Sequence, residues 1–131
     1  TNTFLNSRKK SFFYYVKEFK KLSKFISIPK YENYNSSSFH LFLIHLNLKY
    51  LKFGKDKLFR YLNKKKIFPQ FHYKPLNMYS FYKKKTESFI GAKKYFKSTL
   101  SIPLYYGIKI SEQKYILDNI KKFINDNKIK N

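Results

Sequence analysis

Apolar residues recur at helical spacing near both ends of the chain. From Leu5 to Ile26 they stand three, four or seven residues apart, and lysines fill many of the positions between them. This pattern predicts a long amphipathic helix that Pro29 ends. Its apolar positions are Leu5, Phe12, Val16, Phe19, Leu22 and Ile26. A second stripe near the C-terminus predicts a final helix, with Ser111 as its N-cap and Glu112 in its first turn.

The middle of the chain alternates between strand-like and helix-like segments. Phe39–Leu46 reads F-H-L-F-L-I-H-L, which is too short and too apolar for a typical helix and predicts a covered strand. Helical spacing then predicts a helix from Lys55 to Asn63. A second strand is predicted over Ile67–Tyr73, where Pro69 favours an edge or a bulge.

The remaining segments are shorter. We expect helices over 79–85 and 87–97, and an extended piece over 99–105 in which Pro103 argues against a central strand. The order of elements predicts an α+β domain with a small, mainly antiparallel sheet packed by helices. A length of 131 residues fits one domain, and no repeat or linker divides it.

Composition excludes several function classes. There is no cysteine, so disulfides and thiolate metal sites are excluded, and no apolar run approaches the length of a membrane span. A soluble, cytoplasmic protein is therefore expected. The formal charge of +22 points towards nucleic acid, but only Arg8 and Arg60 are arginines. Because an AT-rich gene supplies lysine, asparagine and tyrosine whatever the function, a solvated lysine surface is the simpler interpretation.

Residues 68–82, F-P-Q-F-H-Y-K-P-L-N-M-Y-S-F-Y, depart from this compositional bias. His72, Tyr73 and Lys74 would present an imidazole, a phenol and an ammonium group together, which suits an anionic, hydroxyl-rich ligand such as a sugar nucleotide. The alternative is a hydrogen-bonded histidine at a strand end, which is the commoner fate of a single histidine. His40 and His45 point to opposite faces of one strand, which argues against a shared metal ion.

The order of these motifs resembles the DegT/DnrJ-type sugar aminotransferases. S-S-F-H-L-F-L-I over 37–44 resembles that family's S-x-H-L-Y/F strand, and I-F-P-Q-F-H-Y-K-P-L-N over 67–77 resembles its G-I-x-x-x-x-H-Y-x-P-x-H segment. L-S-I-P-L-Y over 100–105 resembles the closing L-S-L-P-L-Y. The branch that makes 4-amino-4,6-dideoxy sugars is the most similar. Asn77 replaces the family's second histidine, and Tyr106 and Gly107 replace a proline.

The resemblance implies a pyridoxal-phosphate enzyme that aminates a nucleotide-linked keto-sugar during glycan biosynthesis. Residues 1–131 would be its C-terminal small domain, with a connecting helix over 1–28 and an α+β body over 36–131, as in fold-type I enzymes. The catalytic lysine and the cofactor would belong to an absent large domain, so this chain alone would bind no pyridoxal phosphate. His72, Tyr73 and Lys74 would contact the sugar nucleotide.

The resemblance also implies partners, and two other hypotheses compete with it. The parent enzyme is expected to be a homodimer, and an exposed apolar patch is expected where the large domain docks. The alternative from another class is a basic nucleic-acid-binding or organellar ribosomal protein, which the charge and the interleaved aromatic residues favour. A truncated or decayed product without activity is the third possibility.

Overall fold

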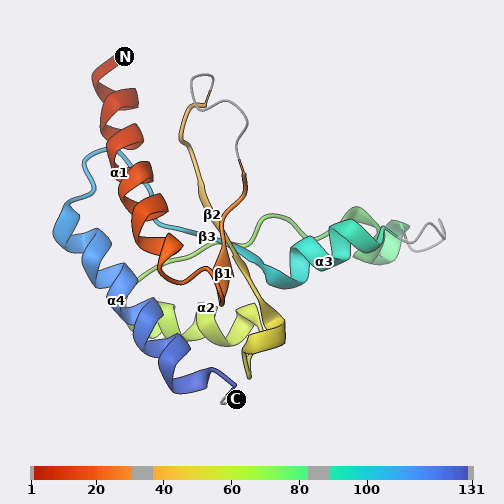
Figure 1. The fold of residues 1–131 in the computed structure, drawn as a ribbon. Helices are drawn as coiled ribbons and strands as arrows, with labels where there is room; N and C mark the ends of the chain where they lie inside the picture. The colour runs from red at the N-terminus through yellow and green to blue at the C-terminus, as the bar shows by residue number, and fades with distance from the viewer. Residues whose placement is uncertain (1, 31–36, 83–88, 130–131) are drawn as a thin grey trace.

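The computed structural model describes residues 2–30, 37–82 and 89–129 (Figure 1). These residues form four helices, a small sheet and three short 3-10 turns. In chain order the elements are α1 (Asn2–Lys20), β1 (Ile26–Ser27), β2 (Phe42–Leu46), η2 (Leu48–Tyr50), α2 (Lys55–Lys64), η3 (Leu76–Met78), η4 (Ser80–Tyr82), α3 (Ile90–Ser98), β3 (Thr99–Ile102) and α4 (Ile110–Asn127).

The sheet is antiparallel throughout, in the order β1-β2-β3. The central strand β2 pairs Phe42 with Ile102 and His45 with Thr99 on one side, and Ile26 with Leu46 on the other. The outer side of β3 is bridged by Gln70 alone among the described residues. The predicted α+β architecture is therefore confirmed, and β3 occupies the non-central position that Pro103 indicated.

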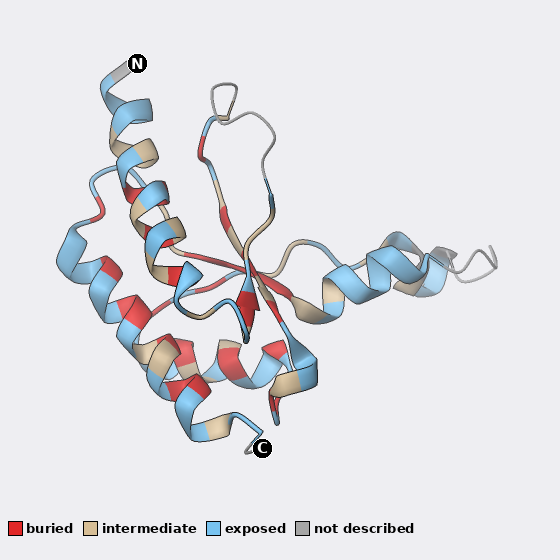
Figure 2. Ribbon diagram, viewed as in Figure 1, coloured by how far each residue is buried: buried red, intermediate tan, exposed pale blue. Residues whose placement is uncertain are grey.

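One face of the sheet carries the core. β2 alternates so that Phe42, Ile44 and Leu46 are buried, and α1 adds Phe12 and Phe19 from the predicted stripe. In Figure 1, α1 and α4 lie along one side of the sheet and α2 below it, whereas α3 extends away in the other direction. Figure 2 shows buried residues on α1, α2 and α4, while α3 is almost wholly exposed. The core therefore holds three helices to one sheet face.

The first helix is shorter than its apolar spacing predicts. α1 ends at Lys20, and a turn follows in which the N–H of Phe25 donates to the carbonyl of Leu22. Ile26 then enters β1 and pairs with Leu46 instead of continuing the helix. The prediction of helix to Ile26 is wrong because an isoleucine at helical spacing fits a sheet edge equally well, and the neighbouring strand decides between them.

Both predicted strands differ from the observed ones. β2 begins at Phe42 because Phe39 adopts a left-handed backbone, with φ of 48°, which interrupts an extended conformation. Ile67–Tyr73 is not a strand, since Gln70 makes only an isolated bridge to Ser101. Pro69 has no N–H to donate to a ladder, so the segment contacts β3 at one residue and then leaves it.

Two of the other helix predictions are confirmed, and two details differ. α2 over Lys55–Lys64 is confirmed, and α3 covers Ile90–Ser98 within one residue of the predicted end. The helix expected over 79–85 is a 3-10 turn at Ser80–Tyr82, and its remainder lies outside the described residues. Ser111 is not the N-cap of α4. Lys109 occupies that position, and its N–H donates to the Glu112 carboxylate at 2.7 Å.

The end of α2 contains a residue in a costly conformation. The N–H of Ile67 donates to the carbonyl of Leu62 at 3.0 Å, and the N–H of Lys66 donates to that of Asn63 at 2.9 Å. These two bonds form a Schellman motif, whose left-handed position is held here by Lys66, with φ of 60°. Glycine adopts this conformation without the clash that a Cβ brings.

Replacing Lys66 by glycine is therefore expected to raise the free energy of unfolding by about 1 kcal/mol. Lys64→Gly is the matched control, because Lys64 is the last residue of the helix and has no left-handed backbone, so glycine there should lower stability, by up to about 1 kcal/mol. Urea denaturation of the three proteins measures both effects. Equal destabilisation by both changes would contradict the strain assigned to Lys66.

Large apolar side chains are exposed along the segment that follows α2. Phe68, Tyr73, Leu76 and Phe81 are between 63% and 87% exposed, and Ile90 at the start of α3 is 71% exposed. These side chains are exposed, and the expectation that they form a docking patch for a large domain stays a prediction. None of the described helices is both long enough and apolar enough to cross a membrane.

Candidate functional site

The second face of the sheet carries a histidine and two hydroxyl residues beside Leu43. Leu43 pairs with Ser101 and His45 with Thr99, so these residues share the face opposite the core. The His45 Nδ1 lies 2.5 Å from the Thr99 Oγ1, and the Tyr95 ring of α3 meets the His45 ring edge to face, with centroids 5.3 Å apart. Ser101 and Thr99 are buried although they are hydroxyl residues. This face therefore has hydrogen-bonding groups fixed by the sheet itself.

His72 is attached to this face of the sheet. The backbone of Gln70 exchanges two hydrogen bonds with the backbone of Ser101, at 2.9 and 3.0 Å. Two residues later, the His72 Nε2 lies 2.8 Å from the Ser101 Oγ. The His72 Nδ1 is buried and has no hydrogen-bond partner among the described residues. Both ring nitrogens are thus turned towards the protein, and one of them is left unpaired.

Tyr73 and Lys74 have the opposite orientation. The Tyr73 side chain is 78% exposed, and its ring stands perpendicular to the His72 ring with centroids 5.1 Å apart. The Lys74 Nζ lies 4.7 Å from the centroid of the Tyr79 ring. The three adjacent residues therefore differ in orientation. His72 bonds the turn to β3, whereas Tyr73 and Lys74 project a phenol and an ammonium group outward.

The sequence placed His72, Tyr73 and Lys74 together but did not predict Ser101 or Thr99 beside them. These two hydroxyls come from Thr99–Ile102, T-L-S-I, for which the sequence predicts only an extended piece. The alternation of polar and apolar residues in that segment was the available signal, because it puts both hydroxyls on one face. The pairing of Ser101 with His72, 29 residues earlier, depends on the Gln70–Ser101 bridge, which the sequence does not reveal.

An apolar pocket of about 590 Å³ adjoins Ser101. Gln70 and Ser101 line it on one side, and Phe68 and Tyr105 contribute aromatic surface. Glu112 also lines it, but its Oε1 accepts from the Tyr105 hydroxyl at 3.2 Å and its Oε2 from the N–H of Lys109 at 2.7 Å. His72 does not line the pocket, and Ser101 joins the two features. The geometry at His72, not the volume, identifies the candidate site.

The buried lysine of the described residues is not placed to hold pyridoxal phosphate. This residue is Lys55, and desolvation lowers the pKa of its amine. However, its Nζ donates to the carbonyl of Phe96 and lies 4.4 Å from the centroid of the Phe71 ring. The amine is therefore already engaged by these two groups. Lys66 lines the apolar pocket, where the only carboxylate, Glu112, is already engaged by its own turn.

His45 and His72 should make the stability of the domain decrease in acid. Burial lowers the pKa of both His45 and His72 from 6.5, and the nearby His40 adds to the effect at His72. Because the unfolded chain then binds protons more readily than the folded one, stability is full above about pH 6.5 and is lost as the pH falls.

We therefore expect the free energy of unfolding to decrease between about pH 7 and pH 5, and to decrease less in His45→Gln. Glutamine retains a group that can bond to Thr99 but does not titrate. His40→Gln removes an exposed histidine that acts only through the pKa of His72, so it should flatten the slope less than His45→Gln does. Urea denaturation at several pH values measures the slopes. An unchanged slope in His45→Gln would show that His45 contributes nothing.

Comparisons of the sequence and the fold with known proteins all match aminotransferases. The sequence profile of the DegT/DnrJ/EryC1/StrS aminotransferase family matches residues 1–121. A UDP-4-amino-4,6-dideoxy-N-acetyl-beta-L-altrosamine transaminase of Campylobacter jejuni subsp. jejuni serotype O:23/36 (strain 81-176) is 34% identical over 118 residues, which cover 88% of this chain. The match spans 31% of that transaminase, so this chain has about a third of its relative's length.

Solved structures share the fold. PseC of Helicobacter pylori, an aminotransferase involved in the biosynthesis of pseudoaminic acid, superposes with a TM-score of 0.82 at 22% identity, over 94% of this chain and 33% of PseC. The aminotransferase TlmJ of Streptoalloteichus hindustanus gives 0.76 at 19% identity, over 94% and 32%. The nucleic-acid-binding alternative is not favoured by these matches.

Proposed function

Because the chain belongs to the DegT/DnrJ/EryC1/StrS aminotransferase family, we propose that it is the small domain of a nucleotide-sugar aminotransferase. The observation that carries the proposal is the 34% identity to a transaminase named for a UDP-linked amino sugar. Tyr73 and Lys74 are exposed and follow His72, which is bonded to Ser101 of β3, so they can offer a phenol and a cation to a sugar diphosphate.

In this proposal the reaction is completed by polypeptide outside these residues. Residues 1–28 join a large domain to the α+β body over 36–131, and the large domain holds the cofactor and the catalytic lysine. The exposed apolar side chains around Phe68, Leu76 and Phe81 support docking of such a domain. A homodimer in the cytoplasm that contributes to glycan biosynthesis is part of the same proposal, and the isolated chain is inactive.

The residues of this chain bind and orient rather than react. The phenol of Tyr73 donates a hydrogen bond to a sugar hydroxyl or a phosphate oxygen, and the Lys74 ammonium attracts the diphosphate. His72 holds the turn through Ser101, so its role is positioning unless its Nε2 exchanges that bond for one to the ligand. When pyridoxal phosphate is bound in the complete enzyme, it accepts and passes on the amino group.

A domain exchange tests this function. The matching segment of the Campylobacter jejuni transaminase is replaced by residues 1–121, and amino transfer is measured with that enzyme's own nucleotide-sugar substrate. We expect the chimera to retain cofactor absorbance and measurable turnover, whereas the enzyme without the segment has none. The isolated 131-residue chain should show no cofactor absorbance. A folded, cofactor-loaded chimera that turns over no keto-sugar nucleotide would refute the proposal.

A further inference from the structure

A second cavity lies between the end of β2 and α3. Its volume is about 590 Å³. Lys49 of η2 lines one wall, and Lys93, Lys94 and Lys97 of α3 line the other, with Asn47 at the end of β2. Leu46, Leu48, Ile90 and Ser98 complete the lining, and no carboxylate lies among the described residues that form it. The cavity is therefore bordered by apolar side chains and by four lysines from two elements that are far apart in the sequence.

The lysines on α3 are arranged unfavourably unless something neutralises them. Lys93 and Lys97 stand one turn apart, and Lys94 lies beside them on the same helix. Like charges at this spacing destabilise a helix. The described salt bridges all use Glu18, which pairs with Lys21 and Lys121, so they offer these lysines no relief.

Burial does not compensate for this repulsion. None of the described α3 side chains is buried, and Ile90 at its start is exposed. The Tyr95 ring contacts His45 of β2, and the carbonyl of Phe96 accepts from the Lys55 Nζ of α2, so the second half of α3 is attached to the domain. Its three lysines stay exposed beside a hollow whose other wall adds a fourth lysine.

We propose that this cavity binds a compact polyanion with two linked phosphate groups, such as pyrophosphate or the diphosphate of a nucleotide. A rise of 1.5 Å per residue places Lys93 and Lys97 roughly 6 Å apart along the helix, which allows each ammonium to meet a different phosphate. Lysine binds phosphate as a point charge, so the planar two-bond geometry of an arginine guanidinium is not required.

The opposite wall adds a donor. The Asn47 side-chain amide donates one N–H to the carbonyl of Lys24 at 3.2 Å, and an amide has a second N–H to offer. The Ser98 hydroxyl is instead turned into the helix, where it donates to the carbonyl of Lys94 at 3.1 Å. The site consists of the four lysines and Asn47. It does not depend on the function proposed above, since none of its residues belongs to the His72 turn.

Calorimetric titration of the 131-residue chain with pyrophosphate, at a fixed ionic strength of about 0.15 M, tests the site. Wild type should bind saturably, and Lys93→Gln with Lys97→Gln should weaken binding by about tenfold, equivalent to about 1.4 kcal/mol. Lys49→Gln, on the opposite wall, should weaken it by about threefold. The matched control is Lys114→Gln with Lys122→Gln, two exposed lysines of α4 that also remove two charges.

The outcomes are distinguishable. Binding that changes by less than about twofold in the α4 control supports a defined site, because net charge falls equally in both double variants. Equal weakening in the two double variants, or no saturable binding by wild type, would overturn the proposal. A short single-stranded RNA that binds more tightly at equal phosphate concentration, and is weakened equally by both double variants, would show an extended polyanion surface and overturn it as well.

Discussion

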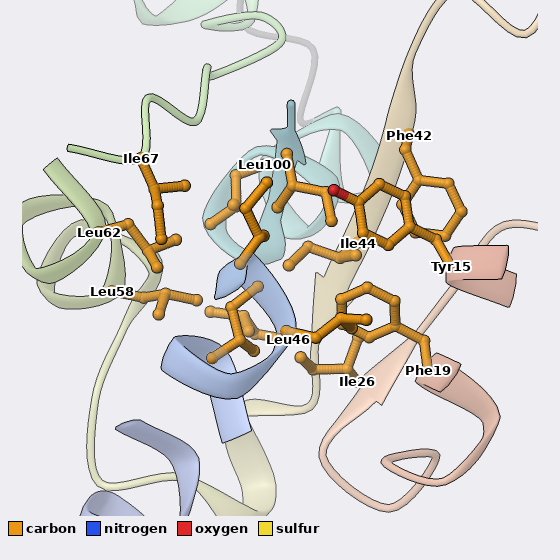
Figure 3. Packing of buried hydrophobic residues seen from close by; sticks show 14 of the residues in the cluster. Tyr15, Phe19, Ile26, Phe42, Ile44, Leu46, Leu58, Leu62, Ile67 and Leu100 are labelled. Carbon is orange, nitrogen blue, oxygen red and sulfur yellow. The ribbon is translucent and has the colours of Figure 1, made fainter. Parts of the chain in front are cut away.

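Replacing Phe42 by alanine is expected to lower the free energy of unfolding by about 3–5 kcal/mol, because it empties the centre of the core. Phe42 is completely buried on the central strand β2. Its ring lies 5.0 Å from those of Phe12 and Tyr15 and 5.6 Å from that of Phe19, measured between centroids. Figure 3 shows Tyr15 and Phe42 packed together above Phe19. One side chain thus joins α1 to the sheet.

The matched control is Phe68→Ala, which removes the same ring from a position that is 63% exposed. That change should alter stability by less than about 0.5 kcal/mol, since surface substitutions rarely do more. Urea denaturation followed by circular dichroism measures both variants. A loss of several kcal/mol is a large share of a small domain's stability, so Phe42→Leu provides a milder variant if Phe42→Ala does not fold. Similar losses at Phe42 and Phe68 would contradict the core described here.

The sequence predicted the core where one periodicity covers a whole element. Phe12 and Phe19 in α1 are buried as their spacing indicated, and so is the apolar stripe of α4, which consists of Ile116, Ile120, Phe123 and Ile124. Leu5 belongs to the predicted stripe of the first helix but is 40% exposed. Tyr15 was not among the predicted positions, although it is fully buried and its hydroxyl donates to the carbonyl of Pro103 at 3.1 Å. Tyrosine is common both on surfaces and in cores, so only the acceptor 88 residues away decides where it lies.

The candidate site was predictable only in part, for a related reason. His72, Tyr73 and Lys74 stood out because their residue types depart from the bias of the chain. Ser101 did not, since serine in a four-residue strand is unremarkable until the bridge to Gln70 brings it to His72. The residues that project outward could be found from chemistry alone. The residue that fixes them could be found only from the pairing of distant segments.

Tyr73→Ala in the chimeric transaminase is expected to lower kcat/KM by about 10–100-fold, the loss that follows removal of one or two good hydrogen bonds and a ring contact. Tyr73→Phe retains the ring and should lose about five- to tenfold. Tyr106→Phe is the control, since it also removes a phenol from a half-exposed tyrosine, outside the His72 turn.

Ser101→Ala separates positioning from contact. It removes the partner of the His72 Nε2 without touching Tyr73, so it should raise KM by loosening the turn while cofactor absorbance stays at the level of the unmodified chimera. If His72 instead contacts the sugar directly, freeing its Nε2 would leave KM unchanged or lower it. Steady-state kinetics over a range of nucleotide-sugar concentrations distinguishes the two. Full activity in Tyr73→Ala would remove the turn from the site, because its exposed phenol would then have no ligand to hold.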